Sequence, residues 1–354
     1  MRIAELPPIE HALAFRNPYA TAPREQIVLS SVDVSNAFGL ADQACTVVQE
    51  MPAPRHIRAN VGGRTVVSSH GGDGTVQLVV AAAIGHVRDD PEVTASNETV
   101  HRPLLEDVLY VPIANGNGNN FACSALGQYA VDPRRLADAP DLDIGFHRPL
   151  AYQVTDERGN TVRSGIATSC FGINAAAIVA AKLHQQKLQL AALGAQTVGQ
   201  QRRFAKETLI TARELLNVKP FSADLTVTTG RDSAREPLRN IAGLELIGSH
   251  IYAKRGRAPV NIDDPRHQVV VATHHMSRTA GLASLLLMSA RLATGQHKRR
   301  PLDLTDTTLT LRVISNQPVP FHTDGEIGDT LMIEPGQLLR LRLGNLAVPT
   351  LIRR

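Results

Sequence analysis

The stretch Gly71–Thr75, which reads Gly-Gly-Asp-Gly-Thr, constrains the fold of this chain more than any other. A short β-branched run, Thr65–Val67, precedes it and predicts a buried strand, whereas the alanine-rich run Val76–Ile84 follows it and predicts a helix. Glycines between a strand and a helix let the backbone approach a bulky anion, to which the helix start offers free N–H groups. The spacing fits neither the dinucleotide fingerprint nor a P-loop. It predicts a phosphate-binding turn, with an ordinary glycine-rich turn as the alternative.

A second glycine-rich turn, residues 114–120, follows a second predicted strand. The run Asp107–Ile113 predicts this strand, and Phe121–Gly127 predicts a helix after the turn. In a parallel α/β sheet both turns would lie at the carboxyl ends of their strands, which is where ligands bind in such sheets. The asparagines of the turn can adopt left-handed backbone angles and can bond to phosphate or ribose without adding negative charge. Taken alone, this segment is equally typical of a flexible loop.

The rest of the chain divides in character near residue 140. Before it, His11–Phe15 predicts a strand that ends in a polar loop, and residues 24–50 predict helix and one short strand. After it, short β-like runs separated by turns predict a β-rich, sandwich-like domain. Residues 174–217 and 281–294 predict helices within this half. We therefore predict an α/β domain over residues 1–140 and a β-rich domain over 141–354, with the end of the chain able to pack back on the first domain.

Composition limits the partners and the compartment. The formal net charge of +4 suits phosphate ligands or an anionic membrane surface, while 4% aromatic residues and the absence of Trp argue against nucleic-acid stacking. The three scattered cysteines fit a reducing cytoplasm, and the N-terminus does not resemble a signal peptide. No segment reaches the roughly 18 apolar residues that a membrane span needs, so we expect any membrane contact to be peripheral.

Carboxylates and histidines in the second half offer candidate chemistry. Asp324 and Glu326 flank Gly325 after a proline-rich apolar run, and paired carboxylates of this kind serve as a general base and its partner. A surface Asp-Gly hairpin turn is the alternative. His274 and His275 are adjacent on a predicted strand and so point to opposite faces, which argues against a shared metal ion.

Together these stretches resemble the catalytic family of the diacylglycerol kinases, in particular the soluble bacterial lipid kinases. The likeness covers most of the chain, with the motifs in the family's order: Asn17–Thr21, Gly71–Thr75, Gly116–Ala122, Ser169–Ala175, Thr294–His297 and Val319–Glu326. The resemblance implies a three-layer, Rossmann-like N-terminal domain of the type shared by NAD kinases and diacylglycerol kinases. It also implies ATP between the domains. The implied nucleotide-binding residues are Asn17, Gly71, Gly72, Asp73, Gly74, Thr75, Gly116, Asn117, Gly118 and Asn119.

The resemblance also implies a mechanism. Asp324 would be the general base for a lipid hydroxyl that attacks the γ-phosphate of ATP, with Mg²⁺ neutralising charge. Asp264 stands where the family has an aspartate of a second, structural magnesium site, although the residues after it differ. Asn117 and Asn120 replace a threonine and an aspartate of the second motif, and Gln77 replaces an asparagine.

The sequence therefore favours an ATP-dependent lipid kinase of phospholipid biosynthesis. This enzyme would be cytoplasmic, or peripheral at the membrane, with ATP and a lipid alcohol as its partners, and it could form a homodimer. NAD kinase is one alternative, and a catalytically weak nucleotide- or lipid-binding homologue is another. The Asp-Gly-Glu motif argues against the first alternative, and the substitutions Asn117 and Asn120 support the second.

Overall fold

The structure is a computed structural model of the chain. It describes residues 8–18, 20, 22, 24–40, 44–53, 55–57, 63–88, 108–116, 119–139, 141–147, 152–155, 158, 161–165, 168–173, 175–176, 219–249, 251–252, 256–257, 268–275, 298–303, 307–323, 331–343 and 348–353. The predicted helices at 174–217 and 281–294 lie almost wholly outside these residues. Among the described helices, none is long and apolar enough to cross a membrane.

Contacts divide the chain into two units. The first comprises Met1–Ala151, Gly248–Gln268 and Gly344–Arg354, and the second comprises Tyr152–Ile247 and Val269–Leu343. The first unit thus reaches Ala151 instead of ending at residue 140, because the strand that begins at Leu142 belongs to its sheet. The end of the chain also returns to this unit and adds a strand to the same sheet.

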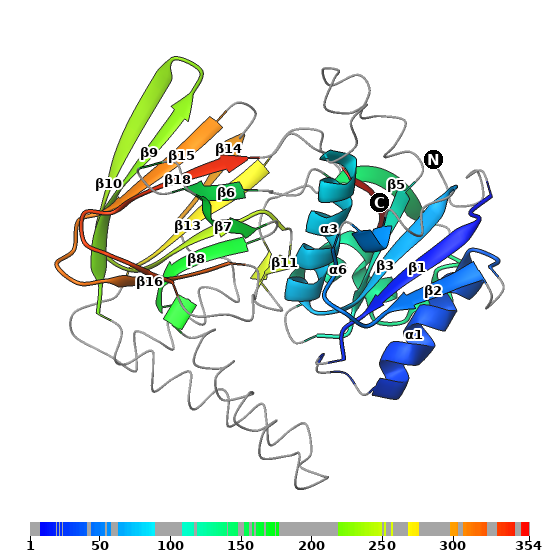
Figure 1. Cartoon of the computed structure of the whole chain (residues 1–354). Coiled ribbons are helices and arrows are strands. Elements are labelled where there is room, and N and C mark those ends of the chain that lie inside the picture. The colour runs from blue at the N-terminus through cyan, green and yellow to red at the C-terminus, as the bar shows by residue number, and fades with distance from the viewer. Residues whose placement is uncertain are drawn as a thin grey trace, which may run out of the picture. The chain divides into compact units, whose positions relative to one another are not determined.

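A six-stranded sheet forms the centre of the first unit (Figure 1). Its order is β2-β1-β3-β4-β19-β5, parallel throughout except that β19 and β5 are antiparallel. The strands are β1 (His11–Arg16), β2 (Cys45–Val48), β3 (Thr65–Gly71), β4 (Val108–Ala114), β5 (Leu142–His147) and β19 (Val348–Arg353). Every residue of β3 and β4 is buried, as expected for central strands covered on both faces.

Helices cover both faces of this sheet. They are α1 (Arg24–Ala37), α3 (Asp73–Arg88), α6 (Asn120–Leu126) and the short 3-10 helices η3 (Gly127–Ala130) and η4 (Pro133–Arg135). Figure 1 shows α1 on one face and α3 with α6 on the other. The predicted three-layer α/β arrangement is confirmed. A two-stranded ribbon, β11 (Ile251–Tyr252) with β12 (Gly256–Arg257), also belongs to this unit.

The order of the strands reverses between β1 and β3. The chain leaves β1 through α1 toward β2 on one side, and leaves β3 through α3 toward β4 on the other. Since such crossovers are right-handed, the two helices lie on opposite faces of the sheet, and the carboxyl ends of β1 and β3 lie where the strand order reverses. This edge is where an open α/β sheet binds its ligand.

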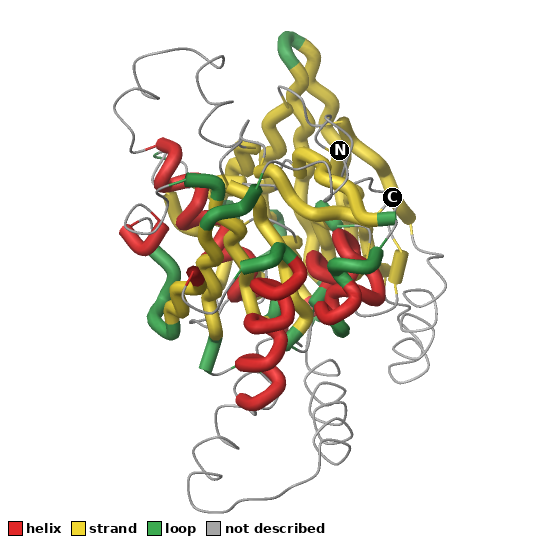
Figure 2. The backbone as a smooth tube through the Cα atoms, turned by 90° about the vertical axis from the view of Figure 1, so that its right-hand side faces the viewer, coloured by secondary structure: helices red, strands yellow, loops and turns green. Residues whose placement is uncertain are grey.

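A single eleven-stranded sheet makes up the second unit, and Figure 2 draws the strands of both units in yellow. Its path is β17-β16-β8-β10-β9-β15-β18-β6-β7, with β13 on β10 and β14 on β13. The predicted β-rich second domain is confirmed. The bounds are β6 (Tyr152–Thr155), β7 (Thr161–Gly165), β8 (Thr168–Gly172), β9 (Phe221–Thr229), β10 (Asp232–Ile247), β13 (Gln268–His275), β14 (Lys298–Asp303), β15 (Thr307–Val313), β16 (Val319–Thr323), β17 (Leu331–Ile333) and β18 (Leu338–Leu343).

The long strand β10 changes character along its length. Ile241–Ile247 is buried and pairs with β8 and β13, whereas Asp232–Arg235 is exposed and pairs only with β9. Beside this exposed half of β10, β9 pairs with β15 as far as Thr229, its last residue (Figure 1). Phe171 and Phe321 pack in the buried part, with ring centroids 4.5 Å apart.

Candidate functional site

The first glycine turn joins β3 to α3 at the sheet edge where the strand order reverses. Gly72 O accepts from Thr75 N at 2.9 Å and from Val76 N at 3.1 Å, which starts the helix directly after the glycines. The Asn17 carboxamide, which follows β1, donates from Nδ2 to Thr75 Oγ1 at 2.9 Å. The structure thus brings together the predicted residues at the ends of β1 and β3.

The second glycine turn lies directly against the first. Asn115 N donates to Gly71 O at 3.0 Å. A Cβ added to Gly116 would lie 2.2 Å from Gly72 Cα and 2.5 Å from Gly72 N, which are backbone atoms that cannot rotate away. A Cβ on Gly71 would lie 2.2 Å from Thr75 Oγ1. The contact between the turns therefore requires glycine at Gly116.

Asn119 closes the second turn on itself. Its backbone has a φ of 54°, in the left-handed region that asparagine tolerates better than most residues. Its Oδ1 accepts from Gly116 N at 2.9 Å, and its Nδ2 donates to Gly116 O. The side chain predicted to bind nucleotide thus shapes the turn from within, and α6 begins at the next residue, Asn120.

Asp73 links the two turns through the start of α6. Its Oδ2 accepts from Asn120 N at 3.1 Å and its Oδ1 accepts from Phe121 N at 3.0 Å. Burial raises the pKa of Asp73, and the two N–H bonds oppose that rise because they stabilise the carboxylate. A carboxylate at a helix N-terminus also interacts favourably with the helix dipole. Both oxygens of this predicted nucleotide-binding residue are bonded to protein backbone.

The sequence did not predict that a buried histidine, His70, lies directly before the first glycine turn and is hydrogen-bonded there. His70, the last residue before the glycines, is fully buried between Ser30 Oγ, 2.9 Å from its Nδ1, and Ser68 Oγ, 2.8 Å from its Nε2. Burial, and to a lesser extent the nearby Arg16 cation, lowers the pKa of His70 to about 3. His70 is therefore neutral at physiological pH.

Arg16 adds a cation at the end of β1. Its Nε donates to Ser31 Oγ at 2.8 Å, and its Nη2 also bonds to this hydroxyl. Burial lowers the pKa of Arg16, which nevertheless stays protonated because a guanidinium titrates far above physiological pH. The strand assignment alone did not identify this residue, because its neighbour Ser31 comes from α1.

Several predicted site residues lie outside the described residues. These are Asn117, Gly118, Asp264 and Asp324. The neighbouring carboxylate Glu326 also lies outside the described residues. Their placement in the site stays a prediction. Strand β16 ends at Thr323, directly before Asp324, and β13 ends in His274 and His275. In the described part of the chain, no group of three or more His, Cys, Asp or Glu residues could hold a metal ion.

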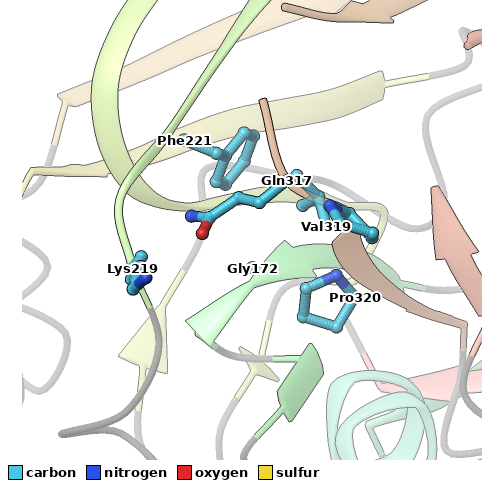
Figure 3. A pocket seen from close by; sticks show the side chains of 7 residues that line it. Gly172, Lys219, Phe221, Gln317, Val319 and Pro320 are labelled. Carbon is cyan, nitrogen blue, oxygen red and sulfur yellow. The ribbon is translucent and has the colours of Figure 1, made fainter. Parts of the chain in front are cut away.

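The second unit contains a small pocket of about 220 Å³ (Figure 3). Its wall combines polar and apolar side chains, and Figure 3 shows the Gln317 side chain extending toward Phe221. The lining residues are Gly172, Lys219, Phe221, Gln317, Pro318, Val319 and Pro320. No predicted site residue is among them.

Comparison with known proteins assigns the fold. No protein-family model matches the sequence, and no curated protein matches it. Two crystal structures assigned as diacylglycerol kinases from Bacillus anthracis str. Sterne superpose with TM-scores of 0.53 and 0.50, at 11% and 12% identity. The first match covers 100% of this chain and 98% of the other, and the second covers 99% of each. The chain has the diacylglycerol kinase fold.

This kinase fold spans both units of the chain, in agreement with the order of the sequence motifs. A yeast NADH kinase in complex with NADH, 10% identical, gives a TM-score of 0.47 over 98% of this chain and 84% of its own, too weak a likeness to bear on function. At identities of 11–12% the comparison establishes the architecture.

Proposed function

We propose that the chain is an ATP-dependent lipid kinase that transfers the γ-phosphate to the hydroxyl of a lipid alcohol such as diacylglycerol. The observation that carries this proposal is the close contact of the two glycine turns, with Gly116 against the Gly72 backbone, at the switch point of the sheet. Glycines at this edge would let a polyphosphate approach the backbone, and the start of α3 points its positive dipole end there.

The residues of the two turns fit an anionic ligand. In the described parts of these turns the one carboxylate, Asp73, directs both oxygens to the backbone of α6, so its charge is stabilised by that helix. The neighbouring side chains, Asn17, Thr75 and Asn119, are neutral. In this proposal they hold the phosphates and ribose of ATP together with Gly71, Gly72, Gly74, Asn117 and Gly118.

Asp324 is the proposed general base. It would take the proton from the lipid hydroxyl as that oxygen bonds to the γ-phosphorus and the bond to the bridging oxygen of ADP breaks. Mg²⁺, which would enter with the nucleotide, supplies charge neutralisation when bound. Asp264 remains the candidate ligand of a second, structural magnesium ion, and contact with a membrane surface would present the lipid.

The test is phosphate transfer by the full-length chain. The chain is incubated with γ-labelled ATP, Mg²⁺ and vesicles that contain one of a panel of lipid alcohols, and a parallel reaction contains NAD. We expect label in at least one lipid, and a fall of roughly 10²–10⁴-fold in Asp324→Asn, the range for loss of a general base. Glu334→Gln, which alters an exposed turn carboxylate, is the matched control and should keep full activity.

Other outcomes separate the alternatives. Label in NADP and in no lipid would replace this proposal with NAD kinase. Tight ATP binding without transfer to any acceptor would identify a catalytically weak binding protein, as the substitutions Asn117 and Asn120 suggest. Full activity of Asp324→Asn would remove the proposed base.

A further inference from the structure

Ser30 on α1 connects the two strand ends beneath the glycine turns. Its hydroxyl bonds to His70 Nδ1 at 2.9 Å and receives Asn115 Nδ2 at 2.9 Å, while it donates to Ile27 O at 2.9 Å. The side chains of Ser30, His70 and Asn115 are all buried, with 4%, 0% and 3% of their surface exposed. These partners are 40 and 85 residues from Ser30 in the sequence.

The members of this chain of bonds are complementary. The Asn115 carboxamide nitrogen can only donate, so Ser30 Oγ accepts from Asn115 Nδ2. Each of the two ring nitrogens of His70 faces one serine hydroxyl, Nδ1 that of Ser30 and Nε2 that of Ser68, and a hydroxyl can either donate or accept. Both ring nitrogens of the neutral, buried His70 are therefore bonded.

Asn115 in turn holds three segments at the sheet edge. Its N–H donates to Gly71 O at 3.0 Å in the first turn, and its carbonyl accepts from Ala22 N at 3.1 Å in the segment after β1. Its peptide bond leads directly to Gly116, whose Cα lies against Gly72. The Asn115 side chain is thus fixed from α1, while its backbone sets where the second turn begins.

We propose that Ser30 and His70 are positioning residues, which hold Asn115 and, through it, the second glycine turn in the conformation that binds ATP. The inference rests on the proposed function, because it concerns the same site. A buried polar network in which every member is bonded specifies one geometry, since any shift leaves a buried donor or acceptor without a partner. Apolar side chains at these positions would pack without setting the angle of the turn.

The decisive comparison is Ser30→Ala against Ser35→Ala. Both serines lie on α1, both are buried, and both donate to a helix carbonyl, Ser30 to Ile27 O and Ser35 to Ser31 O. Only Ser30 also bonds to His70 and Asn115. We expect the ATP dissociation constant, measured by calorimetry on the full-length chain, to rise about tenfold in Ser30→Ala and to stay unchanged in Ser35→Ala.

Two further measurements separate positioning from general destabilisation. In the double variant Ser30→Ala/Asn115→Ala the rise should be close to that of the larger single variant instead of the product, because both changes break one chain of bonds. Amide hydrogen exchange without nucleotide should accelerate over residues 115–121 in Ser30→Ala and not in Ser35→Ala, provided that urea titration shows both variants folded.

The outcomes distinguish this inference from the proposed function. Equal ATP affinities and equal exchange in the two serine variants would overturn the positioning role, even if the unaltered chain binds ATP. Faster exchange over residues 115–121 in Ser30→Ala alone, in a chain that binds no ATP, would overturn the proposed function and leave the role of Ser30 in shaping the turn supported.

Discussion

The two glycine turns lie side by side at one sheet edge but are fixed by different means. The turn after β3 is shaped by its own glycines and by the helix that starts at once, with one side-chain bond from Asn17. The turn after β4 is held by distant partners, Asp73 and Ser30, and by its own Asn119. The first conformation is therefore local in sequence, whereas the second depends on the folded unit around it.

The largest expected effect comes from forcing the turns apart. In Gly116→Ala the new Cβ would overlap Gly72 backbone, so the turns must separate. We expect a loss of at least about 3 kcal/mol in ATP binding, or roughly a hundredfold in the dissociation constant, measured by calorimetry. Gly230→Ala is the control: its φ of +57° makes it strained, but no atom lies within 4 Å of its new Cβ and it is in the β9–β10 turn. It should lower stability without changing ATP affinity.

The second-largest expected effect concerns Asp73, whose carboxylate links the two turns. Asp73→Asn leaves one acceptor oxygen for two N–H groups and places an amide donor against the other, so we expect a loss of about 2 kcal/mol in the free energy of unfolding, measured with urea. Asp232→Asn, in the exposed start of β10, should leave stability unchanged. Equal unfolding midpoints of the two variants would show that α6 does not depend on Asp73.

The sequence predicted the first turn well because its cues are adjacent. Glycines between a β-branched run and an alanine-rich run are enough to place β3 and α3, and β4 and α6 followed from the same pattern. The partners of the second turn were not predictable, since Asp73 reaches Asn120 over 47 residues and Ser30 reaches Asn115 over 85. The polar half of β10 was missed for a related reason: its residues pair with β9 and bury little apolar surface.

Acid should lower the free energy of unfolding through His70. An unfolded histidine takes up a proton near pH 6.5, but buried His70 does so only near pH 3, so the unfolded state binds more protons between these values. The contribution of His70 to stability therefore falls by about 1.4 kcal/mol per pH unit as the pH drops from 6.5 toward 3. Urea titrations at pH 7, 6 and 5 should show a steeper fall in the unaltered chain than in His70→Gln, and between pH 6 and 5 the two slopes should differ by about this amount. Parallel slopes would contradict a neutral, buried His70.

The smallest expected effect is in the first turn. Asn17→Ala removes the bond to Thr75 Oγ1, and Thr75→Ala removes it from the other side, each at a cost of about 1 kcal/mol in ATP binding. The double variant should cost little more than either single change, and Thr75→Ser, which keeps the hydroxyl, should bind ATP nearly as well as the unaltered chain. Strict additivity of the two alanine changes would argue that Asn17 and Thr75 act independently.

The most direct test of the account is where ATP protects the backbone. Amide hydrogen exchange with and without ATP and Mg²⁺, followed by mass spectrometry of the full-length chain, reports this for each peptide. The account predicts slower exchange with ATP in peptides that cover both residues 71–76 and residues 115–122, and no change in the β9–β10 hairpin. ATP protection confined to other parts of the chain, with both glycine turns unaffected, would contradict it.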